Sequence, residues 1–278
     1  MIYLLIVSLL WAFSFGLIKG NLTGINPYFV AFTRMALSSV CFLPLLKPID
    51  IKVRLLSLGA IQFGLMYIFY LAAFQYLRAF EIALFTIFTP IYVSAIADFF
   101  EGRFSRLNIT TSTLAVVACG IYYYHNIAAD VVVGFFLVQL SNICFAFGQV
   151  AYRRLVKDRK KEYSFFAYLY LGAFALTLAS ALFFGGFEDV HLTSKHIWTL
   201  LYLGMLPSGV GFFVWNYGTR KTTIGVVAIF NNLKIPLAVG VSLLFFGESA
   251  NTIKLLICLF LMLIALYLNQ KYRKNETI

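Results

Sequence analysis

The chain has 278 residues, of which 62% are apolar and 12% are charged, and its formal net charge is +11. This composition excludes an ordinary soluble enzyme and a disordered chain, because a compact soluble domain must leave many of its residues facing water. It indicates a polytopic membrane protein, in which four cysteines within apolar runs fit neither a disulfide framework nor a metal site.

Ten apolar runs are each long enough, or nearly so, to cross a bilayer as a helix, which takes about 20 residues. In chain order they are 2–19, 28–46, 54–75, 82–99, 108–124, 131–152, 163–184, 197–217, 224–245 and 253–270. The first run has no basic stretch before it and no small-residue cleavage site after it, so we expect a retained span rather than a signal peptide. The connections are short, which predicts one all-α membrane domain of ten transmembrane helices.

Lys and Arg are unevenly distributed over the connections between these runs. With the amino terminus in the cytoplasm, 16 of the 22 basic residues fall in inside connections and four fall in outside ones. This asymmetry follows the positive-inside rule and predicts that both termini are cytoplasmic. We expect a multi-pass protein of the bacterial inner (plasma) membrane, with an organelle membrane as the alternative that the sequence leaves open. Its basic connections should contact anionic lipid headgroups, and no nucleic-acid partner is expected.

Two segments of the chain resemble each other. Residues 81–102 contain Ile-Ala-Leu-Phe-Thr-Ile-Phe-Thr-Pro and later Phe-Glu-Gly, while residues 223–248 contain Ile-Gly-Val-Val-Ala-Ile-Phe, then Lys-Ile-Pro, and end in Phe-Gly-Glu. Each segment is followed by one more apolar run, which predicts two five-helix repeats, 1–127 and 128–278. An odd number of spans makes the orientations of the repeats opposite. Such inverted repeats are typical of transporters that bind their substrate near the midplane between the two halves.

Several motifs also resemble a known family. They are Trp11-Ala-Phe-Ser-Phe15, the stretch from Pro27 to Arg34, and the stretch from Gly204 through Trp215, Arg220 and Pro236 to Glu248. In these motifs the chain is similar to the EamA-type branch of the drug/metabolite transporter (DMT) superfamily over nearly its whole length. The resemblance implies ten helices in two inverted five-helix repeats and the movement of small organic solutes. One departure is the order Glu101-Gly102 in the first repeat, where the second has Gly247-Glu248, the order usual in the family.

Lys234 lies near the middle of the ninth run, where a charge costs about 2.5–3.5 kcal/mol on insertion scales. Asn231 is on the same helical face, Asn232 is about 100° round the helix, and Pro236 leaves nearby carbonyls without a donor. A lysine with neighbouring amides can bind the carboxylate or phosphate of a solute. The alternative is a structural lysine that hydrogen-bonds to backbone carbonyls between the two halves.

The sixth run carries a polar stripe. Gln139, Asn142 and Gln149 follow one another at offsets of three and seven residues, which places them on one helical face. A polar face on a membrane helix points at protein or water rather than at lipid. The stripe is predicted to line a solute path, with Asn142 nearest the span centre, or to hold helices together by hydrogen bonds.

The eighth run contains Pro207-Ser-Gly-Val-Gly211 at its centre and Trp215 after it. Proline removes a donor and glycine loosens the helix, so we expect a broken helix that exposes backbone groups, with Trp215 placed to stack on the solute. Close helix packing by small residues is the alternative. The hinge positions that we expect are Pro90, Pro207, Gly209, Gly211 and Pro236.

The candidates in the first half are aromatic residues and one arginine. Trp11 is favoured by the family motif, and Tyr70, with Tyr67, places phenol hydroxyls within the membrane. For each aromatic residue, packing is the alternative. Arg34 lies about one turn from the middle of the second run. It is expected to snorkel outward, to pair with a carbonyl or to contact the solute.

No Asp or Glu lies in the middle of an apolar run, which disfavours a proton-driven antiporter of cationic drugs. We expect a secondary transporter that moves a small polar organic solute, either an amino acid or a carboxylate-bearing metabolite, by alternating access. The alternatives are a transporter of amines or drugs with the same fold and a lipid-linked flippase subunit. The sequence contains no catalytic constellation, so we expect no enzyme, no cofactor and no metal, and either a monomer or a homodimer.

Overall fold

The computed structural model describes residues 2–102, 110, 113–114, 117, 128–156, 162–220, 224–249 and 251–275. Only the backbone is described at 162, 219–220, 224–229, 231–232 and several positions after 257. Within these ranges every element of regular structure is helical. The predicted all-α class is confirmed for this part of the chain.

The helices follow one another as a series of long rods, three of which are interrupted. In chain order they are α1 Ile2–Asn21, α2 Pro27–Phe42 with η1 Leu43–Leu45, α3 Lys52–Gly59 with η2 Ala60–Leu65 and α4 Met66–Ala73, α5 Ala79–Phe85 with η3 Thr86–Phe88 and α6 Thr89–Phe100, α8 Ala129–Leu155, α9 Glu162–Phe183, α10 Ser194–Leu203 with η4 Gly204–Val210 and α11 Gly211–Arg220, α12 Ile224–Phe245, and α13 Thr252–Asn275.

Seven of these rods are long and apolar enough to cross a membrane, and each begins and ends within three residues of a predicted span. The ninth and tenth runs correspond to α12 and α13, whose described apolar parts are the shorter stretches Leu233–Phe245 and Thr252–Leu261. The fifth run, 108–124, lies almost entirely outside the described residues. The number of ten spans therefore stays a prediction.

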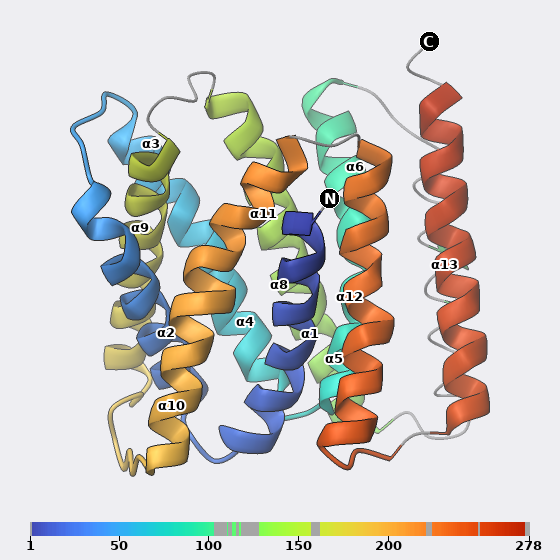
Figure 1. The fold of residues 1–278 in the computed structure, drawn as a ribbon, viewed down its shortest axis with the longest axis horizontal. Helices are drawn as coiled ribbons and strands as arrows, with labels where there is room; N and C mark the ends of the chain where they lie inside the picture. The colour runs from blue at the N-terminus through green and yellow to red at the C-terminus, as the bar shows by residue number, and fades with distance from the viewer. Residues whose placement is uncertain are drawn as a thin grey trace.

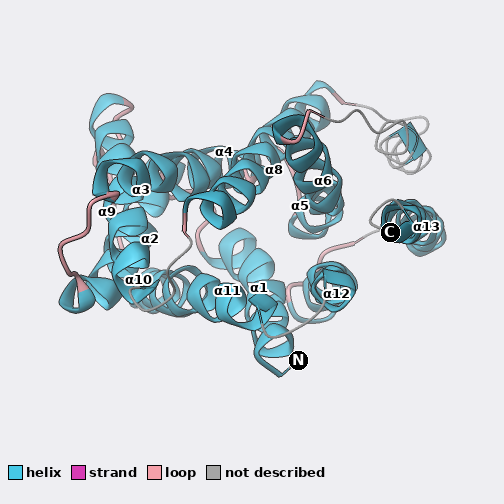
Figure 2. Ribbon diagram, turned by 90° about the horizontal axis from the view of Figure 1, so that it is seen from above, coloured by secondary structure: helices cyan, strands magenta, loops and turns pink. Residues whose placement is uncertain are grey.

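Seen from above, the helices stand in two rows (Figure 2). One row contains α3, α4, α8, α5 and α6, and the other contains α10, α11, α1 and α12. The rows are joined where α2 packs on α9 and where α5 packs on α12. Helix α13 stands at the edge of the bundle in both views, and α1 begins toward the end of the bundle at which α13 finishes (Figure 1).

Three rods change helical type near their middle, and proline accounts for two of the changes. Pro207 lies inside the π-helical segment η4, and Pro90 follows the 3₁₀ segment η3. Proline has no backbone N–H to donate and its ring clashes with the preceding turn, so the regular α pattern cannot continue through it. The irregularity predicted at Pro207 is present as this π-helical segment, and the helix continues through it rather than breaking. Such segments place free carbonyls in the interior, where side chains can reach them.

Helices α3 and α9 touch through two glycines. A Cβ added to Gly59 would overlap the backbone carbonyl of Leu169, and a Cβ added to Gly172 would overlap that of Leu56. In lipid, helices associate largely through close van der Waals contact, for which small residues are needed. This contact packs α3 against α9, which also packs against α2.

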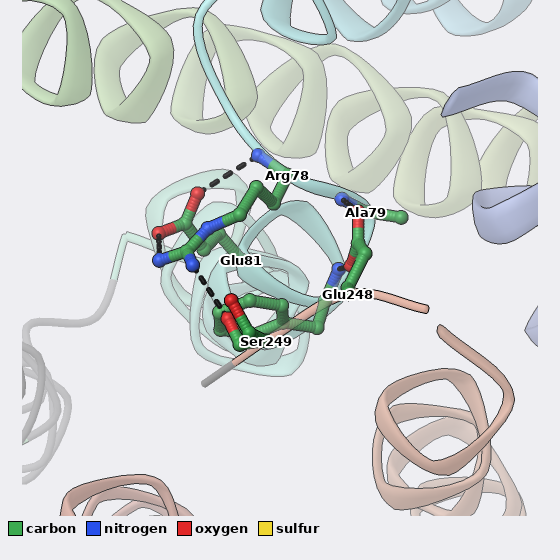
Figure 3. Close-up of polar contacts among 6 residues, drawn as sticks. Arg78, Ala79, Glu81, Glu248 and Ser249 are labelled. Carbon is green, nitrogen blue, oxygen red and sulfur yellow. Dashed lines mark hydrogen bonds and ion pairs between the residues drawn. The ribbon is translucent and has the colours of Figure 1, made fainter. Parts of the chain in front are cut away.

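The connection after α12 is tied to the start of α5 by a set of hydrogen bonds that we call the outer clasp (Figure 3). The Glu248 carboxylate accepts from the backbone N–H of Ala79 at 2.7 Å and of Phe80 at 3.0 Å. Arg78 donates to the carbonyl of Ser249 at 2.6 Å and forms an ion pair with Glu81 at 2.7 Å. A carboxylate is favoured at a helix N-terminus because the first N–H groups there have no helical acceptor.

The reversed order of Glu and Gly in the two repeats has a structural explanation. Gly102 follows the end of α6 with φ of +68°, and Gly247 follows the end of α12 with φ of +65°. In both places glycine supplies the left-handed turn that ends the helix. The acidic residue falls before it in one copy and after it in the other. Glu248 caps α5, whereas Glu101 pairs with Arg154 at 3.9 Å, with both side chains nearly half exposed.

Candidate functional site

A cavity lies between the two rows of helices. It contains about 580 Å³ of atom-free space, open solvent included. Six of its 14 lining residues are aromatic, and the others include hydroxyls, one amide and two cations. The lining residues are Trp11, Ser14, Phe15, Arg34, Met66, Tyr67, Tyr70, Thr86, Thr89, Ser141, Asn142, Phe145, Phe212 and Lys234.

Four of the predicted substrate-binding residues lie in this wall: Trp11, Tyr70, Asn142 and Lys234. The other four do not line the cavity or lie outside the described part. Trp215 packs behind Trp11, with ring centroids 5.0 Å apart, Gln149 is half-buried two turns farther along α8, and the side chains of Asn231 and Asn232 are outside the described residues. The structure therefore brings together candidates from both halves of the chain, while their role in binding stays a prediction.

Lys234 comes from the middle of α12 and is only 7% exposed. Its Nζ lies 5.3 Å from the centroid of the Trp11 ring, a distance at which a cation is attracted to the face of an indole. Because Lys234 also lines the cavity, an anionic solute group could reach it there. The aromatic face lowers the cost of keeping this charge inside the protein.

Trp11 is held by the broken segment η4. Its Nε1 donates to the carbonyl of Pro207 at 3.1 Å, and its ring packs on Phe212 with centroids 5.1 Å apart. The single N–H of the indole is therefore used within the protein. What Trp11 offers to a solute is its ring face rather than a hydrogen bond.

Asn142 is fully engaged on its donor side. Its Nδ2 donates to the carbonyl of Phe85 at 3.0 Å and to Gln139 Oε1 at 3.2 Å, and its Oδ1 accepts from Thr89 Oγ1 at 3.1 Å. Phe85 and Thr89 flank the 3₁₀ segment η3, so Asn142 holds α8 against this break. Of the two readings of the polar stripe, the geometry favours hydrogen bonding between helices at this position. One lone pair of Oδ1 remains for a solute.

Arg34 is the residue whose environment the sequence described least well. At 2% exposure it does not snorkel outward, so that expectation is wrong. Its Nε donates to Ser208 Oγ at 3.0 Å and its Nη2 donates to Tyr67 OH at 3.0 Å. Its guanidinium carbon lies 4.4 Å from the centroid of the Tyr67 ring. Among the described residues, its Nη1 has no hydrogen-bond acceptor.

Three hydroxyl-bearing residues around the broken segment were not predicted as a group. Ser208 Oγ donates to the carbonyl of Leu203 at 2.7 Å, and Tyr170 OH lies 2.7 Å from the Ser208 carbonyl and 2.8 Å from that of Gly209. Ser38 Oγ donates to the Gly204 carbonyl at 2.9 Å. The Pro-Ser-Gly-Val-Gly motif signalled the break, but nothing in the sequence indicated which helices supply the hydroxyls that satisfy it.

The charge of the wall is positive. Arg34 and Lys234 contribute two cations, and no Asp or Glu is among the described residues that line the cavity. The ion pairs found within the described ranges join Arg78 to Glu81 and Arg154 to Glu101, all away from the cavity. A low-dielectric site with this charge favours an anionic guest and disfavours a cationic one.

Comparison with known proteins places the chain in a family. Residues 1–124 and 132–270 match the EamA-like transporter family. The chain is 37% identical over 250 residues to a biotin transporter of Salmonella typhimurium, covering 87% of this chain and 84% of that protein. It is 33% identical over 287 residues to a biotin transporter of Escherichia coli strain K12, covering 100% and 96%. It is also 33% identical over 281 residues to a probable biotin transporter of Pseudomonas aeruginosa, covering 98% of each.

A solved crystal structure supports the fold independently of sequence. It superposes with a TM-score of 0.68 over 96% of this chain and 95% of that one, at 16% identity. An identity this low shows the fold alone. With the family match over both halves, and with the identity to full-length relatives, the chain belongs to the EamA-like transporter family and is a multi-pass integral membrane protein, not an enzyme.

Proposed function

We propose that this protein is a secondary transporter that carries biotin across the membrane. The relatives that share 33–37% of its residues over most or all of its length are biotin transporters by name. Biotin carries a carboxylate on a short aliphatic chain and, at the other end, a compact ureido ring fused to a thioether ring. Of the two solute classes that the sequence suggested, it is a carboxylate-bearing metabolite rather than an amino acid.

The observation that carries the proposal is the chemistry of the cavity wall. Two cations, Arg34 and Lys234, line the cavity, and no Asp or Glu is among the described residues of its wall. The aromatic residues Trp11, Tyr70 and Phe212 give the apolar surface on which a flat bicyclic ring can lie. An amine or a cationic drug would meet unfavourable charge in the same place.

The hydroxyls of the wall suit the other end of the solute. Thr86, Thr89 and Ser141 each donate their single proton within the protein, to Ala83 O, Asn142 Oδ1 and Met66 O respectively. Their remaining lone pairs can only accept. A ureido ring presents two N–H donors, so the hydroxyl oxygens complement it.

The proposed transport cycle is based on the two predicted repeats. Two inverted five-helix repeats, 1–127 and 128–278, would rock about the cavity, with both termini in the cytoplasm of a bacterial cell. The family match falls in two segments that are separated near this border, and the cavity takes its wall from both sides of it. The interrupted helices at Pro90 and Pro207 are suited to act as hinges, because they already depart from regular hydrogen bonding.

The direct test is uptake of radiolabelled biotin into liposomes that contain the purified protein. We expect saturable, protein-dependent uptake that unlabelled biotin competes for, and that amino acids and amines at the same concentration do not. Liposomes without protein and protein carrying the exposed-site variant Lys52→Gln are the controls. Transport of an amine or an amino acid in place of biotin would overturn the proposal. Lipid scrambling without biotin uptake would instead support the flippase alternative.

A further inference from the structure

Arg34 stands out among the buried polar groups because its hydrogen bonding is satisfied on one edge only. Nε and Nη2 form the side edge of the guanidinium, and they meet Ser208 and Tyr67, whose hydroxyl oxygens are themselves 2.9 Å apart. This edge is therefore closed to another ligand. The end of the group is formed by Nη1 and the second hydrogen of Nη2. Nη1 is buried and has no hydrogen-bond acceptor among the described residues.

Burying a guanidinium whose hydrogen bonding is incomplete is energetically unfavourable for the protein. Arg34 carries a guanidinium group, is 2% exposed, and forms no ion pair with a carboxylate among the described residues. Its hydroxyl partners and the Tyr67 ring offset only part of the cost of removing the charge from water. Arg34 lines the cavity, and a solute carboxylate bound against its Nη1 would supply both the missing acceptor and the missing countercharge.

We propose that Arg34 is the residue that anchors the carboxylate of the solute, through Nη1 and the end of the guanidinium. The proposal rests on the proposed function and deepens it, since it assigns carboxylate selectivity to one side chain. The planar fork of arginine fits two carboxylate oxygens at once. Lys234, which lines the same cavity from α12, contributes charge as a single point.

The same guanidinium connects the solute to the interrupted helix. Its Nε bond reaches Ser208, which lies in η4 between Pro207 and Gly209, and the Ser208 carbonyl is held by Tyr170. A carboxylate that binds Arg34 is thereby linked through one side chain to the segment that is suited to bend. Arg34 thus positions η4 relative to the solute as well as binding it.

The experiment compares binding of biotin with that of biotinamide, its neutral amide, to the reconstituted protein. The wild type is expected to prefer biotin. In Arg34→Gln, biotin affinity should fall by about 10- to 100-fold, as expected for loss of a hydrogen-bonded charge pair, while biotinamide affinity changes by less than about threefold. Arg34→Lys should keep part of the preference, because it keeps the charge but loses the fork. The matched control, Lys52→Gln, removes an exposed cation at the start of α3 and should leave the preference unchanged.

Binding of biotinamide also shows that a variant is folded. If Arg34→Gln fails to fold, Arg34→Lys decides, and an unchanged preference for biotin in that variant overturns the assignment. Tyr67→Phe removes one partner of the closed edge but leaves Nη1 in place, and it should keep the preference for the carboxylate.

The outcomes separate this inference from the proposed function. A wild type that binds no biotin but prefers another carboxylate to its amide refutes biotin as solute and leaves Arg34 to be tested with that pair. A wild type that binds biotin and biotinamide equally, or an Arg34→Gln variant with the wild-type preference, refutes the role of Arg34 and leaves biotin transport standing. A wild type that binds no carboxylate refutes both.

Discussion

Lys234 shows how far a single residue in the sequence could be interpreted. A charge in the middle of an apolar run indicated an interior position, and the structure places it in the cavity wall beside the Trp11 ring. The same argument applied to Arg34, but it left three interpretations of that side chain open. Its side chain reaches partners 33 and 174 residues away in the chain, and no local pattern shows which helices will meet it.

Replacing Lys234 by Met should lower biotin affinity by about 5- to 50-fold, because a cation of the wall is lost where little water can replace it. Lys234→Arg should retain most of the affinity. The measurement is equilibrium binding of radiolabelled biotin to purified protein. Affinity that is unchanged in Lys234→Met would mean that this lysine is structural, the alternative that the sequence left open.

At the scale of the helical elements, the interruptions within helices and the contacts at helix ends shape the cavity. Pro207 and Pro90 could be predicted to interrupt their helices, because proline acts through its own backbone. The partners that stabilise the interruptions, Tyr170 at η4 and Asn142 at η3, come from other helices. Asn142 was expected to line the solute path or to hold helices together, and its Nδ2 donates to the Phe85 carbonyl and to Gln139 Oε1.

The outer clasp and its counterpart at the end of α6 give a matched pair of acidic residues. Glu248→Gln should destabilise the protein by about 1 kcal/mol, because a charged acceptor at a helix N-terminus becomes a neutral one. Glu101→Gln should change stability by less than about 0.5 kcal/mol, because its pair with Arg154 is long and solvent-exposed. Chemical unfolding in detergent measures both. Equal effects would show that the clasp adds nothing beyond a surface ion pair.

Two glycines within helices should respond to alanine with opposite signs. Gly59→Ala should destabilise the protein by about 1–3 kcal/mol, since the new methyl group overlaps the Leu169 carbonyl and neither backbone can move away freely. Gly240→Ala meets nothing within 4 Å and should be neutral or stabilising by up to about 1 kcal/mol. Thermal unfolding of the two variants is the measurement. A stable Gly59→Ala protein would contradict the close contact of α3 and α9.

For the whole molecule, the cavity exists only where the two rows of helices meet. Its wall takes Arg34 from α2, Asn142 from α8 and Lys234 from α12. The charge asymmetry of the connections further predicts that both ends of the chain lie on one side of the membrane. In the structure, α1 begins toward the end of the bundle at which α13 finishes (Figure 1).

Reporter fusions test this orientation. A fluorescent protein that matures only in the cytoplasm should be bright at either terminus, and a phosphatase that is active only outside should be inactive at both. A fusion of the phosphatase after Lys195, in a connection predicted to lie outside, should be active and serves as the internal control. An active phosphatase at the carboxyl terminus would contradict an even number of spans.

The sequence by itself determined what depends on composition and on local pattern. Apolar runs, prolines and the distribution of Lys and Arg were enough to predict seven helices to within three residues of their ends. The same patterns, together with the family motifs, indicated the transporter class. Only the tertiary structure decided that Arg34, Tyr67 and Ser208 form one hydrogen-bonded group beside the cavity. The physical reason is that lipid requires nearly every face of a membrane helix to be apolar, so the pattern along one helix carries little information about which neighbour each face will meet.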